Sequence, residues 1–126
     1  MDIKMKLVDV LSLNQTLKAI IDEDNAKIDP LFKFRLLGIM KTIEQHVLNF
    51  EVIRNEKIME YGKKNEDNNI EIKNDDKETL KKFNESLKPI INSEVTVNID
   101  KLKVEDVFNK GVNAEYLIGL YQIIEG

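Results

Sequence analysis

The fold is decided by one continuous stretch, residues 31–61, which reads LFKFRLLGIMKTIEQHVLNFEVIRNEKIMEY. Its apolar residues recur every three or four positions, which is the spacing of an amphipathic α-helix. Asp29 and Pro30 precede the stretch, and proline is favoured at the first position of a helix, so we expect one long helix over about residues 30–61. At 1.5 Å per residue this helix is roughly 46 Å long, which exceeds the ~36 Å diameter of a compact domain of this size.

The long helix carries apolar residues on two faces. Its broad stripe alternates steps of four and three, the seam of a helical hairpin or coiled coil, and comprises Phe32, Leu36, Ile39, Met40, Ile43, Val47, Phe50, Ile58 and Tyr61. Arg54 falls in the centre of this stripe, so the seam ends or reaches water there, or an acidic residue meets the charge. About 150° around the helix lies a thinner stripe, here named the outer stripe: Phe34, Leu37, Leu48, Val52 and Met59. Lys41 and Asn55 interrupt it.

Three short stretches of alternating apolar and polar residues predict strands, at residues 3–7, 70–73 and 95–99. Strands this short are stable only when they pack on helices, and each has one apolar face, as in a sheet covered on one side. We therefore expect an α+β fold that is mainly helical. It has a long central helix in a helical hairpin, packed with a small three-stranded β-sheet and a C-terminal helix.

The remaining helices are expected to begin at polar capping residues: Asp9 before residues 10–21, Asp75 with Glu78 before residues 80–91, and Asn113 before residues 116–124. Pro89 should kink or end the second of these helices. We also expect one helical turn at residues 104–108. Gly62 is expected to cap the long helix, and the polar residues 63–69 that follow are expected to form a mobile loop.

Composition places the chain in one domain, residues 1–126, because 126 residues with 42% apolar content supply one modest core. The formal net charge of −4 argues against nonspecific binding to nucleic acid or to anionic membranes, which requires a positive field. Basic runs are short, and Arg35 and Arg54 are the only arginines. No stretch approaches the ~20 apolar residues of a membrane span, and no signal peptide is evident, so we expect a cytoplasmic location or a particle assembled there.

Catalytic and metal-binding patterns are absent from the sequence. The chain has no cysteine and one histidine, His46, which excludes thiolate sites and a multi-histidine zinc site within one chain. The five glycines are scattered singly, so there is no phosphate-binding loop. The acidic residues 22–24 lack the spacing and the glycine of an EF-hand and favour a solvated loop. We therefore predict no catalytic residue, no metal site and no cofactor, and we expect that the protein is not an enzyme.

The outer stripe is the remaining candidate for function, and two interpretations are open. The strands and the last helix could cover it within the same chain, in which case it is ordinary core. Alternatively, it meets a partner, because a helix of this length extends beyond a fold this small. We favour the second interpretation and predict an interface at Phe34, Leu37, Leu48, Val52 and Met59, most simply with another copy in a symmetric dimer.

Three segments together carry a resemblance to a known group of proteins: residues 54–62 (RNEKIMEYG), residues 83–87 (FNESL) and residues 94–99 (EVTVNI). In these segments the chain resembles small, mostly uncharacterised proteins encoded by tailed bacteriophages and prophages, and the likeness runs from the first helix to the end. The resemblance implies a phage or prophage origin, a location in the host cytoplasm or the virion, and a role through protein contacts. It carries no active-site residue.

Two functions therefore fit the sequence. The first is a non-catalytic phage or prophage protein that self-assembles, as a dimer or higher oligomer, or serves as an accessory component of the virion. The alternative is a phage-encoded inhibitor that binds a host defence protein, because such inhibitors are often small and acidic. An enzyme and a nucleic-acid-binding protein fit less well, and no membrane partner is expected.

Overall fold

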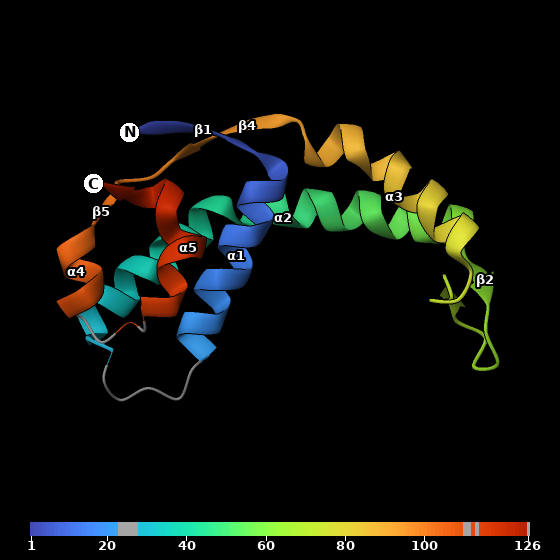
Figure 1. Cartoon of the computed structure of the whole chain (residues 1–126), viewed down its shortest axis with the longest axis horizontal. Helices are drawn as coiled ribbons and strands as arrows, with labels where there is room; N and C mark the ends of the chain where they lie inside the picture. The colour runs from blue at the N-terminus through green and yellow to red at the C-terminus, as the bar shows by residue number, and fades with distance from the viewer. Residues whose placement is uncertain (23–27, 110–111, 113, 126) are drawn as a thin grey trace.

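The computed structural model describes residues 1–22, 28–109, 112 and 114–125. The chain is mainly helical, and its longest helix, α2 (Pro30–Tyr61), runs through both parts of the molecule (Figure 1). We name these parts by their residues. The head consists of the described residues in 1–48 and 93–125, and the arm consists of residues 49–92.

The predicted long helix is confirmed at both ends. Asp29 caps it, because its Oδ2 accepts a hydrogen bond of 3.0 Å from the backbone N–H of Phe32. At the other end the N–H of Gly62 donates to the carbonyl of Ile58 at 2.7 Å. Gly62 is extended, with φ −79°, rather than left-handed. Glycine is needed there because a Cβ would lie 2.5 Å from the Ile58 carbonyl oxygen and 2.9 Å from that of Glu71.

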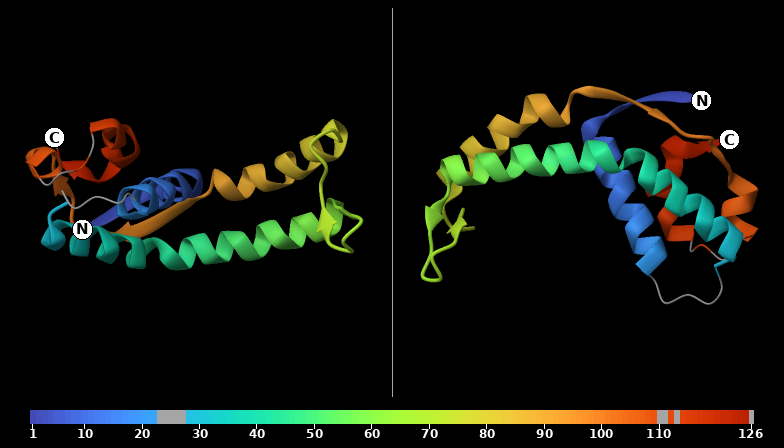
Figure 2. Two further views of the ribbon diagram at one scale, coloured as in Figure 1. Left: turned by 90° about the horizontal axis from the view of Figure 1, so that it is seen from below. Right: turned by 180° about the vertical axis from the view of Figure 1, so that it is seen from behind.

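The helix α2 is curved rather than straight (Figure 2). In its first half the Thr42 hydroxyl donates a 3.0 Å hydrogen bond to the carbonyl of Gly38, four residues earlier. Such bonds back to the preceding turn bend helices, so this contact contributes to the curvature.

The head is built around α1 (Leu7–Asp22), which packs on the first half of α2. The strand β1 (Asp2–Lys6) pairs antiparallel with β4 (Glu94–Asn98). The short helix α5 (Leu117–Leu120) packs on α1, where Gly119 approaches Thr16 so closely that an added Cβ would overlap its side chain. The buried core of the head is Met5, Leu7, Val10, Leu13, Leu17, Ile20, Ile28, Phe32, Leu36, Ile39, Ile43, Val97, Ile99, Leu102, Val107, Val112, Leu120 and Ile123.

The C-terminal part of the head consists of short elements. They are β5 (Leu102–Lys103), α4 (Val104–Asn109), two 3₁₀ turns (Ala114–Tyr116 and Tyr121–Ile123) and β6 (Ile124–Glu125). The strands β5 and β6 pair in parallel. The helical turn predicted at residues 104–108 is confirmed by α4.

The arm contains the second half of α2 and α3 (Lys77–Ile91), which runs back along it (Figures 1 and 2). The strands β2 (Lys63–Lys64) and β3 (Ile70–Glu71) form an antiparallel hairpin between the two helices. The turn of this hairpin is closed by Asn65, whose side-chain oxygen accepts hydrogen bonds from the backbone N–H groups of Asp67 and Asn69.

The predicted three-stranded sheet is wrong for the described residues, because their strands form three separate pairs: β1–β4, β2–β3 and β5–β6. The strands predicted at residues 3–7 and 95–99 lie one residue earlier, as β1 and β4, and they pair with each other. The third, at residues 70–73, is only two residues long and lies at the far end of the arm. Alternation of apolar residues identifies a strand but does not identify its partner.

Several predicted boundaries also differ from the structure. The cap of α3 is Asp76, not Asp75, and it accepts hydrogen bonds from both the N–H and the hydroxyl of Thr79, at 3.2 and 2.7 Å. Asp9 lies inside the first turn of α1 rather than capping it. Pro89 does not end α3, which continues to Ile91.

Two further expectations concern the loops and the C-terminus. Residues 63–69 include the strand β2, so this segment is not wholly a loop. The last helix is interrupted, and residue 124 belongs to β6. The predicted cap at Asn113 lies outside the described residues.

Candidate protein-interaction surface

All five residues of the outer stripe are exposed. Their exposed fractions are 71% for Phe34, 45% for Leu37, 45% for Leu48, 58% for Val52 and 62% for Met59. The described strands and the C-terminal helix therefore do not cover this face of α2. Because large exposed apolar side chains that share one face mark interaction sites in soluble proteins, the outer stripe is the candidate functional surface.

The spacing of the outer stripe keeps it on one side of α2 along most of its length. Leu37, Leu48 and Met59 are separated by steps of eleven residues. Eleven residues complete three turns at about 3.67 residues per turn, close to the helical period, so such positions lie nearly in line. The stripe therefore begins in the head and continues without change of face along the arm.

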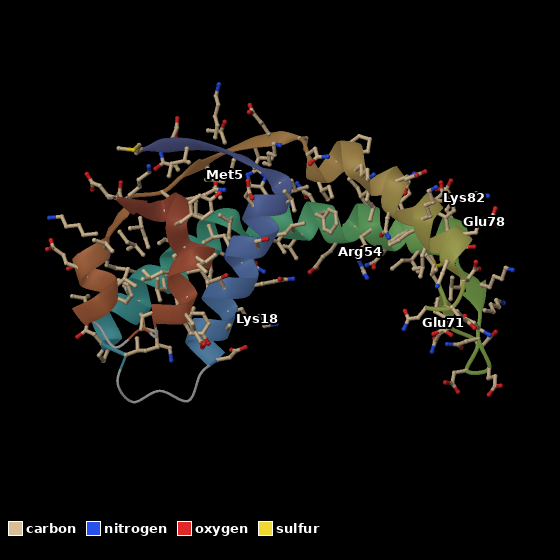
Figure 3. All side chains as sticks on the ribbon, viewed as in Figure 1. Met5, Lys18, Arg54, Glu71, Glu78 and Lys82 are labelled. Atoms are coloured by element: carbon tan, nitrogen blue, oxygen red, sulfur yellow. The ribbon has the colours of Figure 1, made fainter. Side chains whose placement is uncertain are left out.

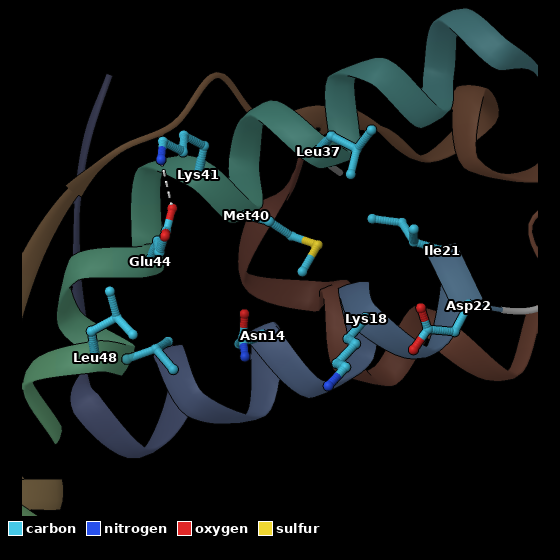
Figure 4. Close-up of a pocket in the computed structure, with 10 residues that line it drawn as sticks. Asn14, Lys18, Ile21, Asp22, Leu37, Met40, Lys41, Glu44 and Leu48 are labelled. Atoms are coloured by element: carbon cyan, nitrogen blue, oxygen red, sulfur yellow. Dashed lines mark ion pairs between the residues drawn. The ribbon is translucent and has the colours of Figure 1, made fainter. Parts of the chain in front are cut away.

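In the head, the outer stripe borders a groove of about 460 Å³ between α1 and α2 (Figure 4). Its apolar wall consists of Ile21 from α1 and of Leu37, Met40, Val47 and Leu48 from α2. Ile21, Met40 and Val47 are half-buried, whereas Leu37 and Leu48 are exposed at its edge. The groove has room for more than one apolar side chain.

The rim of the groove carries charges of both signs. On α2, the ammonium of Lys41 forms an ion pair of 2.9 Å with the carboxylate of Glu44 (Figure 4). On α1, the exposed side chains of Lys18 and Asp22 line the opposite wall, and neither forms an ion pair with another described residue (Figures 3 and 4). An apolar floor with a mixed charged rim is the usual composition of a protein-binding surface.

In the arm, no other described helix or strand packs on the outer stripe. The helix α3 packs on the other side of α2 through Phe83 and Leu87, which are buried, and α2 presents half-buried Phe50 and Ile58 of its broad stripe. Arg54, at the centre of that stripe, is exposed and forms no ion pair with a described residue (Figure 3). The sequence left three possibilities at Arg54: the seam ends, it reaches water, or an acidic residue meets the charge. The structure shows that the seam reaches water there.

The structure also places the residues that were considered for chemistry. His46 is half-buried on α2. Among the described residues, no three or more histidine, cysteine, aspartate or glutamate side chains form a group that could hold a metal ion. Of the acidic residues 22–24, only Asp22 lies within the described part of the chain.

Within the described part of the chain, no helix has the length and apolar character needed to cross a membrane.

Sequence reasoning missed the α1 wall of the groove, formed by Asn14, Lys18, Ile21 and Asp22. The available signal was Ile21, which follows the buried Ile20 and therefore sits at the edge of the apolar face of α1. Met40 occupies the corresponding edge of the broad stripe on α2. Apolar residues at the facing edges of two packed helices indicate a groove, but only once the pairing of the helices is known.

Comparison of the chain with protein-family models, with curated proteins and with solved structures gave no match.

Proposed function

We propose that this chain is a non-catalytic protein of a tailed bacteriophage or prophage that acts through protein contacts, by self-assembly or as an accessory component of the virion. One observation carries the proposal: five large apolar side chains stand exposed on one face of α2, and that face also borders a groove. The resemblance described above supports the phage origin.

The exposed face is not needed to complete the core of this chain. The broad stripe already supplies Phe32, Leu36, Ile39 and Ile43 to the head. Leaving a further apolar stripe in water forgoes about 25 cal/mol for each Å² of apolar surface that could be buried. A partner that covers the outer stripe recovers this free energy, which is the physical basis of the proposed contact.

The groove favours a second candidate, a phage-encoded inhibitor that binds a host defence protein. A concave apolar site between two helices accepts an amphipathic helix of another protein, so the same surface serves either function. The identity of the bound protein separates the two candidates: a copy of the chain or a virion protein supports the first, and a host defence protein supports the second.

The test replaces Leu48 and Val52 together with aspartate. Because both side chains are exposed, helix content measured by circular dichroism should stay near that of the wild type, while proteins captured from infected or lysogenic cells should be lost. The matched control, Thr42→Asp with Asn49→Asp, also adds two charges at exposed positions of α2, but outside the outer stripe. It should retain the captured proteins.

Two outcomes would overturn the proposal. If the double variant at Leu48 and Val52 unfolds the chain while the control does not, the outer stripe is part of the core. If the variant folds and captures the same proteins as the wild type, the outer stripe is not the contact surface. Mass spectrometry of purified virions tests the virion version separately, because absence of the protein from particles excludes it.

A further inference from the structure

We propose that the outer stripe pairs with the outer stripe of a second copy of this chain, in antiparallel orientation, about a two-fold axis that passes by Leu48. This inference rests on the proposed function and names the partner of the same surface. It depends on where α2 places its charges and on the difference between the two ends of the stripe.

The charges on α2 favour the antiparallel over the parallel orientation. In a parallel pair about a two-fold axis, residues at the centre of the stripe face themselves, so Lys41 would meet the partner's Lys41. Like charges that face each other across an interface destabilise it. With the axis at Leu48, Lys41 instead meets the partner's Asn55, and Glu44 meets the partner's Val52.

The charges also favour this register over its neighbours. Moving the axis by half a turn, to lie between Leu48 and Val52, places Met59 against the charged side chain of the partner's Lys41. Moving it the other way, to lie between residues 46 and 47, places Leu48 against the partner's Gln45. With the axis at Leu48, apolar residues meet apolar residues: Leu48 faces its own copy and Leu37 faces the partner's Met59.

The two halves of the stripe are complementary in shape. The half in the head has the groove beside it, lined by Leu37 and Leu48. The half in the arm presents Val52 and Met59, which are 58% and 62% exposed. The antiparallel arrangement brings the arm half of each copy onto the groove half of the other, so one surface contacts itself, as a two-fold dimer requires.

The α1 wall of the groove carries a positive charge, on Lys18, that offsets a repulsion between carboxylates in this arrangement. The antiparallel pair places the partner's Glu51 on the same side as Glu44, where two carboxylates would repel. Lys18 lies on the opposite wall of the groove and supplies the positive charge there. Neither Lys18 nor Glu51 forms an ion pair with another residue in the described ranges.

The size of the surface predicts a weak dimer. From Leu37 to Met59, α2 spans about 33 Å, and a helix with its side chains is about 10 Å wide. Each copy therefore offers on the order of 300–400 Å² from α2, and the α1 wall adds to it. A standard interface buries roughly 800 Å² per partner, so we expect a weak dimer that dissociates on dilution.

The absence of cysteine from the chain permits a direct test with single-cysteine variants and a short bismaleimide reagent at high protein concentration. Leu48→Cys should form a covalent dimer by itself, because the two copies of residue 48 meet at the axis. Leu37→Cys and Met59→Cys should each remain monomeric, because two copies of residue 37 lie about 33 Å apart in the antiparallel pair. A mixture of these two variants should form a dimer. Thr42→Cys, on the polar side of α2, measures random collision.

The outcomes distinguish this inference from the proposed function. Cross-linking of Leu37→Cys with itself shows a parallel pair and overturns the antiparallel arrangement. No cross-linking above the Thr42→Cys background, together with a monomer by light scattering at high concentration, overturns self-pairing. The proposed function survives that result if Leu48→Asp with Val52→Asp still abolishes capture of another protein, and it fails if capture is unchanged.

Discussion

The head and the arm share the helix α2 but differ in how extensively other elements pack against it. Every residue of the main buried core lies in the head, where α1 and the first half of α2 pack together and α5 packs on α1. In the arm, the buried apolar residues among those described are Phe83 and Leu87, both from α3. The arm half of α2 is therefore supported from one side, and its other side carries the outer stripe.

This comparison shows that a continuous helix does not imply uniform stability. Regions with few buried apolar contacts open with lower free energy than the core. The arm is such a region, and it is also where the outer stripe faces no other element within the described residues. A partner that covers the stripe would therefore stabilise the arm more than the head.

The largest effect is expected from neighbouring phenylalanines of α2 that differ in burial. Phe32 is 2% exposed and Phe34 is 71% exposed. Phe32→Ala should lower the free energy of unfolding by about 3–5 kcal/mol, because it removes core packing and leaves a cavity. Phe34→Ala should change it by less than about 0.5 kcal/mol. Urea unfolding followed by circular dichroism measures both, and equal losses would show that the outer stripe is core.

A smaller and more local effect is expected in the arm. Phe83→Ala removes one of the two buried side chains of α3, so hydrogen exchange of the α3 amides should accelerate by about a hundredfold, equivalent to about 2.7 kcal/mol. The amides of α1 should keep their protection, because α1 belongs to the head. Exchange measured by mass spectrometry reports both helices at once. Equal acceleration in α1 and α3 would mean that head and arm unfold as one unit.

A pair of glycine substitutions should act in opposite directions. At Gly38 an added Cβ meets nothing within 4 Å, so Gly38→Ala should stabilise α2 by about 0.5–1 kcal/mol. At Gly62 the Cβ would lie 2.7 Å from Cγ2 of Ile70 as well as near two carbonyl oxygens. Gly62→Ala should therefore displace the hairpin and cost about 1–3 kcal/mol. Thermal unfolding compares the two, and a stabilising Gly62→Ala would contradict the close approach described above.

The smallest effect concerns the pH dependence of the cap of α3. The hydroxyl and the N–H of Thr79 donate hydrogen bonds to Asp76 and hold the pKa of its carboxyl below the ordinary value of 3.8. The stabilisation by this carboxylate is fully present above that ordinary value, and it is lost as the pH falls through the lowered pKa.

The reference for this prediction is Asp76→Asn, because asparagine also caps helices but does not titrate. The difference in thermal midpoint between the wild type and this variant should be constant above about pH 5 and change in disfavour of the wild type below about pH 4. A difference that stays constant down to the acid limit would mean that the carboxylate is not engaged as described.

The elements that follow from local patterns were predictable from the sequence. They are the helix α2, its start at Pro30, the approximate positions of β1 and β4, and the face that bears the outer stripe. All of these depend on periodicity or on neighbours within a few residues. The pairing of strands was not predictable in this way. The two-residue strands β5 and β6 exist only because distant segments lie side by side, and no alternation marks them.

The candidate site shows the same difference between features set by local sequence and features set by the packing of distant segments. The five outer-stripe residues were identified from the helical period alone, and the structure shows them exposed. The groove beside Leu37 and Leu48 was missed, because it exists only where α1 crosses α2. Residues such as Lys18 have no local pattern that sets them apart from other exposed lysines.

The pairing of β1 with β4 has a consequence for the order in which the molecule is completed. Met5 lies opposite Val95, so the whole arm is inserted between the two halves of the head. During synthesis, α1 and the first half of α2 are made before the arm, and β4 follows the arm. Contacts between such distant segments close late and slowly in folding. The hydrophobic core of the head, which includes Val97 and Ile99, therefore cannot be completed until the whole arm has been synthesised.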